Sequence, residues 1–152
     1  MKIAIGADHG GIHLKEEIKK LLFSLGQEVD DVGSHDEQAV DYPDYAFLVC
    51  EKVVGCKVDR GILICGTGIG MTISANKIPG IRCALVHDVF SAKATREHND
   101  SNVLAMGERV IGAGHALEIV RVWLATDFSK ADRHAHRIGK VTALEEKFTL
   151  HP

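Results

Sequence analysis

The chain has no excess of positive charge and no long apolar run. Its 152 residues include 18 Lys and Arg against 21 Asp and Glu, which gives a formal net charge of −3 at pH 7. Proteins that bind the phosphate backbone of nucleic acids normally carry a basic excess, so nucleic acid is not expected as the main partner. No stretch reaches the ~18 apolar residues that a membrane span needs, and no signal peptide follows Met1. We therefore expect no membrane association and a cytoplasmic location.

Paired cysteines and metal-ligand motifs are also missing. The chain contains no Cys-x-x-Cys pair among its four cysteines, Cys50, Cys56, Cys65 and Cys83. A chain of this length can bury a core without disulfides, so we expect Cys50, Cys56 and Cys83 to be small apolar residues that are buried or half-buried. The nine histidines are scattered and no His-Glu-x-x-His motif occurs, so no metal site is expected.

Apolar runs that are typical of strands alternate with helical patterns, and no linker or internal repeat interrupts them. The pattern predicts strands at 2–6, 28–32, 61–65, 82–86 and 103–106, and helices at 14–25, 42–54, 71–77, 89–97, 116–125 and 131–148. Such alternation with continuously apolar strands indicates one α/β domain, a parallel sheet with helices on both faces. Ligands of these sheets bind outside the carboxyl ends of the strands, so segments 7–10, 65–70 and 87–88 are expected to line one rim.

The loop after the third predicted strand is the most informative segment, reading Cys-Gly-Thr-Gly-Ile-Gly at 65–70. Glycines let several backbone N–H groups approach one anion. A thiol at a helix N-terminus is favoured as the thiolate, Thr67 could hydrogen-bond to it, and such a group can act as a base or a nucleophile. Met71 stands where the dinucleotide fingerprint needs its third glycine, and no Gly-Lys-Ser/Thr occurs. The alternative is a tight turn that binds nothing.

Three further places carry polar groups that suit a ligand. Asp8 and His9 follow the first strand and indicate ligand binding, although Asp8 could instead cap the next helix. Arg133 and Arg137 share one face of the last helix, where two guanidinium forks suit a phosphate; the alternative is a solvated basic face. His98 ends a predicted helix, and a single histidine there is more often structural.

Motifs along nearly the whole chain resemble those of type B ribose-5-phosphate isomerase, in the family that includes galactose-6-phosphate isomerase subunits. The matching segments are Ile-Gly-Ala-Asp-His-Gly-Gly at 5–11, Asp-Tyr-Pro-Asp-Tyr-Ala at 41–46, Gly-Ile-Leu-Ile-Cys-Gly-Thr-Gly-Ile-Gly-Met at 61–71, Ala-Asn-Lys at 75–77, Gly-Ile-Arg at 80–82, Glu-His-Asn-Asp-Ser-Asn-Val-Leu at 97–104, Gly-Glu-Arg-Val-Ile-Gly at 107–112 and Arg-His-Ala-His-Arg at 133–137. The resemblance implies a Rossmann-like three-layer α/β/α sandwich with a five-stranded parallel sheet, spanning residues 1–152 as a single domain. It also implies no metal or organic cofactor and a homodimer or tetramer with shared active sites, in which helix 131–148 packs on the partner.

The resemblance implies a role for each matching residue. Cys65 corresponds to the base that moves a proton between the C2 and C1 positions of the sugar. Backbone amides would hold the enediolate oxygens, at Gly66, Gly68, Ile69 and Gly70. Residues matched to opening of the furanose ring are Thr67 and His98, with Asp8 nearby. Phosphate ligands would be His9, Arg133 and Arg137, with Arg109 as a further candidate, and Asn99 would bind substrate from the partner subunit, as His98 would.

One branch of the family replaces the cysteine by a glutamate at the position of Met71. Because Met71 cannot take a proton and Cys65 is present, the chain is placed in the cysteine branch and is expected to interconvert ribose 5-phosphate and ribulose 5-phosphate. Allose 6-phosphate or galactose 6-phosphate remains an alternative substrate, although the galactose enzymes divide their catalytic residues between unlike subunits. A sugar-phosphate-binding regulator is a third alternative, but it would not need Cys65, Thr67 and His98 together.

Overall fold

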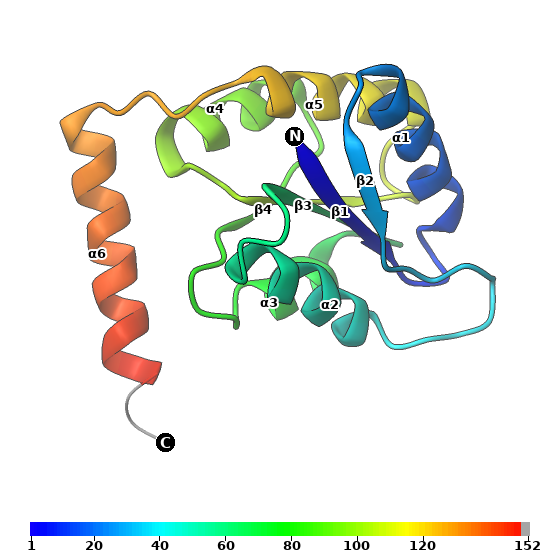
Figure 1. Ribbon diagram of the computed structural model, residues 1–152, viewed down its shortest axis with the longest axis horizontal. Coiled ribbons are helices and arrows are strands. Elements are labelled where there is room, and N and C mark those ends of the chain that lie inside the picture. The colour runs from blue at the N-terminus through cyan, green and yellow to red at the C-terminus, as the bar shows by residue number, and fades with distance from the viewer. Residues whose placement is uncertain (150–152) are drawn as a thin grey trace.

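A parallel sheet forms the centre of the protein (Figure 1). The computed structural model describes residues 1–149, and the strands occur in the order β2-β1-β3-β5-β4. Their bounds are β1 (Lys2–Ala7), β2 (Glu28–Asp31), β3 (Arg60–Cys65), β4 (Cys83–Leu85) and β5 (Val103–Gly107). Every residue of β3 and β5 is buried, because helices cover both faces of the sheet.

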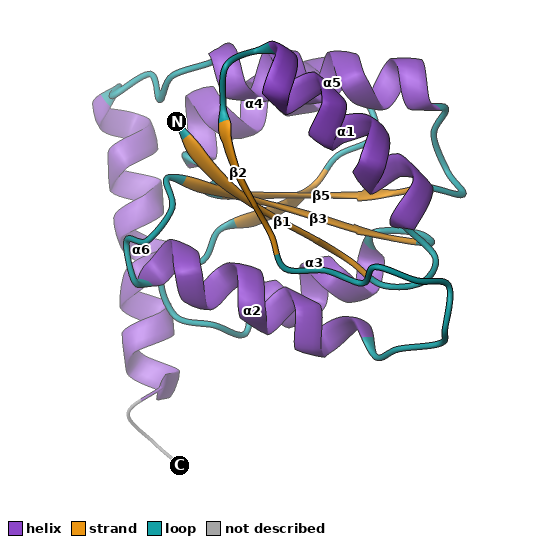
Figure 2. Ribbon diagram, turned by 45° about the vertical axis from the view of Figure 1, so that its right-hand side comes forward, coloured by secondary structure: helices purple, strands orange, loops and turns teal. Residues whose placement is uncertain are grey.

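Helices form one layer on each face of this sheet (Figure 2). One layer contains α1 (Ile12–Ser24), α4 (Val89–Asn99) and α5 (Ala113–Ala125), and the other contains α2 (Tyr42–Val54) and α3 (Ile69–Ala75). The apolar side chains accordingly separate into two core clusters, one around Trp123 and Met106 and one around Val49 and Leu63. The Rossmann-like α/β/α sandwich with five parallel strands expected from the sequence is confirmed.

The last helix, α6 (Asp132–Thr149), stands beside the sandwich rather than over a face of the sheet (Figures 1 and 2). Its side chains Val141, Leu144 and Phe148 are exposed by 57%, 57% and 70%. A groove of about 930 Å³ separates this helix from the body of the protein. Helix α6 therefore presents an apolar surface that no other segment within residues 1–149 covers.

The predicted elements are all present, but some of their ends lie elsewhere. Helix α3 begins at Ile69 instead of Met71, because Gly68 already serves as its N-cap. It ends at Ala75 because the side chain of Asn76 turns to the next strand, donating to the carbonyl of Cys83 at 2.9 Å and accepting from its N–H at 2.8 Å. The end of α3 thus depends on contacts between Asn76 and Cys83, which the periodicity of the sequence around the helix does not indicate.

Within residues 1–149, no helix has both the length and the apolar character required to cross a lipid bilayer.

Candidate functional site

Cys65 ends the central strand β3 and leads directly into the glycine loop. Its side chain is 5% exposed, and its Sγ accepts a hydrogen bond from the Gly68 N–H at 3.0 Å. The sequence suggested Thr67 as the partner of this thiol, but the Thr67 hydroxyl instead accepts from the Ile69 N–H at 3.3 Å. The backbone amide is the better placed donor because the loop turns back over the sulfur.

The loop is packed against the end of β5, which leaves no room for a side chain at Gly68. This residue has φ of +78°, and a Cβ there would lie 2.5 Å from Leu85 Cδ1 and 2.8 Å from the carbonyl carbon of Met106. The following turn binds the loop backbone, with the Glu108 N–H donating to the Cys65 carbonyl at 2.9 Å. Gly68 is thus required by close approach and by a left-handed conformation.

Asp8 and Arg109 lie beside this loop. The Asp8 N–H donates to the Ile64 carbonyl at 3.2 Å, and its buried carboxylate accepts from the Gly10 N–H at 2.8 Å. A Cβ at Gly66 would lie 3.5 Å from the Arg109 guanidinium carbon, so this cation lies over the start of the loop. A carboxylate, a thiol and a guanidinium therefore meet at the carboxyl ends of β1, β3 and β5.

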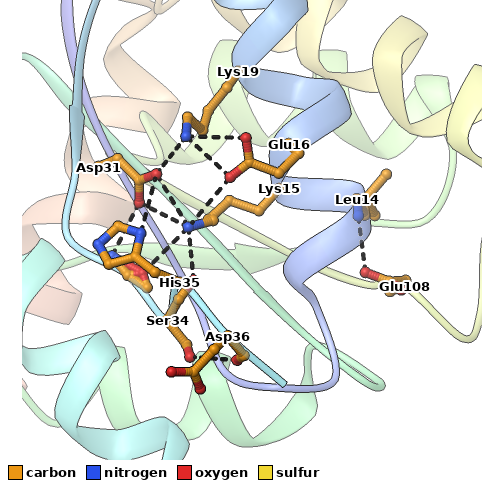
Figure 3. Close-up of polar contacts among 10 residues, drawn as sticks. Leu14, Lys15, Glu16, Lys19, Asp31, Ser34, His35, Asp36 and Glu108 are labelled. Carbon is orange, nitrogen blue, oxygen red and sulfur yellow. Dashed lines mark hydrogen bonds and ion pairs between the residues drawn. The ribbon is translucent and has the colours of Figure 1, made fainter. Parts of the chain in front are cut away.

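Asp8 does not cap helix α1, which was the alternative role for it. The N-cap of α1 is Gly11, and the side chain that accepts from its first turn belongs to Glu108, whose Oε2 lies 2.8 Å from the Leu14 nitrogen (Figure 3). The capping residue lies in the turn after β5, 94 positions later in the chain. The Asp8 carboxylate instead accepts from the Gly10 N–H within its own turn, at the rim of the site.

Two histidines complete this rim. The exposed His9 accepts from the Val40 N–H through Nδ1 at 3.3 Å. His87, which follows β4, accepts from the Gly107 N–H through Nε2 at 3.0 Å, and burial lowers its pKa while Asp88 opposes the shift. Both rings use one nitrogen as an acceptor, so each neutral ring carries its proton on the other nitrogen.

His98 and Asn99 lie at the opposite edge of the sheet. Helix α4 begins after β4, at the carboxyl edge, and its 11 residues carry the chain back by about 16 Å toward the amino ends of the strands. At that end the Arg82 Nε donates to the Asn99 carbonyl at 3.0 Å, just before β4 begins. The length of α4 therefore places His98 and Cys65 of the same chain at opposite edges of the sheet.

The first turns of α6 pack against this end of α4. The buried His134 ring lies 4.4 Å from the His98 ring, centroid to centroid. His134 lies 2.8 Å from the Ser129 hydroxyl and accepts from the Arg133 Nε at 3.2 Å. Burial, with the nearby His98 and Arg133, lowers the pKa of His134, so a neutral ring supports His98. Arg137 lines the groove beside them.

The structure thus divides the predicted residues into two groups. The first, which we call the Cys65 half-site, lies at the carboxyl edge and comprises Asp8, His9, Cys65, the loop 66–70 and Arg109. The second, the His98 half-site, lies at the amino edge and comprises His98, Asn99, Arg133 and Arg137. One chain brings the members of each group together but keeps the two groups apart.

Sequence reasoning missed the supporting roles of four residues: Lys15, His87, Glu108 and His134. Lys15 carried a readable signal, because it lies three and seven positions before the buried Ile18 and Leu22 on the apolar face of α1. The sequence placed His87 on the rim but gave it no partner. Glu108 and His134 act through contacts with other elements, for which a single sequence offers no signal.

Comparison with known proteins identifies the protein family that has this arrangement of residues. A sequence model of the family described as Ribose/Galactose Isomerase matches residues 3–141. The chain belongs to this family. The protein YwlF of Bacillus subtilis (strain 168) is 64% identical over 97% of this chain and 99% of its own length. Ribose-5-phosphate isomerase B of Escherichia coli (strain K12) is 47% identical over 96% of this chain and 97% of its own.

A solved structure agrees with these sequence matches. Ribose-5-phosphate isomerase B of Clostridium thermocellum superimposes with a TM-score of 0.95 at 51% identity, covering 97% of this chain and 99% of that one. This member of the ribose/galactose isomerase family is therefore an enzyme, an aldose–ketose isomerase of sugar phosphates.

Proposed function

We propose that this enzyme interconverts ribose 5-phosphate and ribulose 5-phosphate through an enediolate, with Cys65 as the base. The observation that carries the proposal is the hydrogen bond from the Gly68 N–H to the Cys65 Sγ at 3.0 Å, at the mouth of a glycine loop. An isomerase of this kind must remove a proton from a carbon beside a carbonyl, which needs a positioned base and donors for the oxygens that become charged. The Cys65 half-site supplies both.

In this mechanism the Cys65 thiolate takes the proton from C2 of the open-chain aldose and returns it to C1 of the enediolate, while the proton of the C2 hydroxyl moves to the C1 oxygen. The Gly68 amide donates to the sulfur and the Ile69 amide to Thr67, so the loop amides of Gly66 and Gly70 hold the two oxygens. Thr67 and Asp8 assist the opening of the furanose ring together with His98. The phosphate stays remote from the reacting carbons, so its binding energy positions the substrate without entering the chemistry.

We infer that each complete site combines the Cys65 half-site of one chain with the His98 half-site of a second copy. The separation of the two groups by the length of α4 supports this assembly. The exposed apolar side chains of α6, Val141, Leu144 and Phe148, also support it, because a partner would cover them. The substrate phosphate would then lie between His9 of one chain and the arginines of the other, Arg133 and Arg137, with Arg109 close to the sugar.

The substrate is tested by measuring isomerisation of phosphorylated sugars of four, five and six carbons. A relative from Pectobacterium atrosepticum is named D-erythrulose-4-phosphate isomerase, so a four-carbon substrate must be included. We expect kcat/KM for ribose 5-phosphate to exceed that for the shorter and longer sugar phosphates by about tenfold or more. One added or missing carbon usually lowers kcat/KM by at least this factor. Ketose formation is followed by NMR, with unphosphorylated ribose as the control. A higher kcat/KM for allose 6-phosphate or a four-carbon phosphate would replace the proposed substrate.

Changing Arg137 to Ala is expected to raise KM for the phosphorylated substrate by about 10- to 100-fold and to change kcat much less, because a charge-assisted bond to phosphate is lost. Steady-state kinetics measures the split. Lys140→Ala is the matched control, since it removes an exposed positive charge from the same helix, and its KM should match that of the wild type. An unchanged KM for Arg137→Ala would remove this residue from the phosphate site.

A further inference from the structure

Lys15 is a charged side chain that lies entirely inside the protein. It is 0% exposed, on the face of α1 that also buries Ile18 and Leu22. Burying an ammonium group is costly unless it is paired and hydrogen-bonded, and an apolar residue would suit this face of the helix without that cost. The contacts of Lys15 therefore indicate what the buried charge contributes.

The Lys15 ammonium joins the end of β2 to the segment that follows it. Its Nζ donates to Asp31 Oδ1 at 2.9 Å, to Asp31 Oδ2 at 3.1 Å and to the Ser34 carbonyl at 2.8 Å (Figure 3). Asp31 also accepts from the Gly33 N–H at 3.0 Å and pairs with Lys19 at 2.6 Å. Lys15 thus holds both the carboxylate that shapes the turn and the backbone of the turn itself.

This turn begins the loop 32–41, which reaches the Cys65 half-site at both of its ends. At the start, the Ser34 N–H donates to the Ala7 carbonyl at 2.7 Å, directly before Asp8. At the far end, the Val40 N–H donates to His9 Nδ1 at 3.3 Å. With Nδ1 used as an acceptor, the neutral His9 ring carries its proton on Nε2, where it can donate to an anion.

We propose that Lys15 is a positioning residue of the substrate site. By fixing Asp31 and Ser34, it holds the loop 32–41 where the Val40 amide sets the tautomer and orientation of His9. The proposal rests on the proposed function, in which His9 binds the substrate phosphate. The buried Lys15 ammonium then contributes to phosphate binding without touching the substrate. Residues that hold the binding residues in place often have this role in ligand sites.

The test replaces Lys15 by Met, which keeps the length of the side chain and removes the donors. We expect KM and the dissociation constant for inorganic phosphate to rise about 5- to 10-fold, with kcat within about 2-fold of the wild type. Long-range ¹H–¹⁵N NMR of the His9 ring should change from the Nε2–H tautomer to a mixture. Lys19→Met is the matched control: Lys19 also pairs with Asp31 but does not reach Ser34, so all three readouts should stay unchanged.

Asp31→Asn provides a second variant in case Lys15→Met does not fold, because it keeps an oxygen for Gly33 and weakens the ion pair. The decisive variant is Lys15→Met if it folds, and Asp31→Asn if it does not. The proposal is overturned if that variant keeps both the KM and the His9 tautomer of the wild type. His9→Asn separates this result from the proposed function. If His9→Asn leaves phosphate binding intact, the phosphate role of His9 fails, whereas an altered tautomer in Lys15→Met would still support positioning by Lys15.

Discussion

Replacing Cys65 by Ala is expected to lower kcat by about 10³- to 10⁴-fold while KM changes little, because a positioned general base contributes to the transition state and not to substrate binding. The only side chain near C2 that the proposed mechanism uses as a base is this thiol. The residue is buried in the cluster that also contains Met71 and Leu63, and Ala fits the same space. Ketose formation by the purified variant, at saturating and subsaturating sugar phosphate, measures both constants.

Cys50 offers the matched control. It is a buried thiol of the same core cluster, where burial raises its pKa to about 12, so it stays protonated at neutral pH. Cys50→Ala removes the same atoms as Cys65→Ala and is expected to retain the kcat of the wild type. Turnover near that of the wild type in Cys65→Ala, with the fold verified by circular dichroism, would contradict the role of Cys65 as the base.

Mixing two inactive variants is expected to restore activity if the site is shared between chains. In a heterodimer of Cys65→Ala and His98→Asn, one site carries both defects and the other carries none. Random association makes half of the dimers heterodimers with one intact site of two, so activity should return to about one quarter of the wild-type value. The variants carry different affinity tags, are mixed after reversible dissociation, and are assayed with sugar phosphate.

The control pair is Cys65→Ala with Thr67→Ala. Both residues belong to the Cys65 half-site, so every site in the mixed dimer keeps one defect and activity should stay at the level of the single variants. Co-purification through the two tags verifies that heterodimers form in both mixtures. Verified heterodimers of Cys65→Ala and His98→Asn without restored activity would contradict the shared site.

Most of the fold could be predicted from the sequence, because its signals are local. The apolar run at Ile62, Leu63 and Ile64 has the length and burial of a central parallel strand, and the predicted helix over 42–54 has the bounds of α2. The ends of α3 were placed two residues too late. They depend on the left-handed Gly68 and on the pairing of Asn76 with Cys83, which are set by the approach of other elements.

The candidate site was predicted less completely than the fold. Cys65, Asp8 and the glycine loop are adjacent as the rule for parallel sheets expects, because they follow neighbouring strands. The sequence suggests the Thr67 side chain as a hydrogen-bond partner for the thiol, whereas the backbone N–H of Gly68 makes this bond. A side-chain pattern cannot indicate which amide a turn directs at the sulfur.

The sequence by itself determined the layers of this protein, its family motifs and the residue types available for proton transfer and phosphate binding. These follow from periodicity and from short motifs, each of which lies within one segment of the chain. The tertiary structure alone decided that the Cys65 and His98 half-sites lie at opposite edges, that Glu108 caps α1, and that Lys15 holds the loop next to His9. The physical reason is that these relations depend on helix rise, strand order and the burial of charge, which join residues far apart in the sequence.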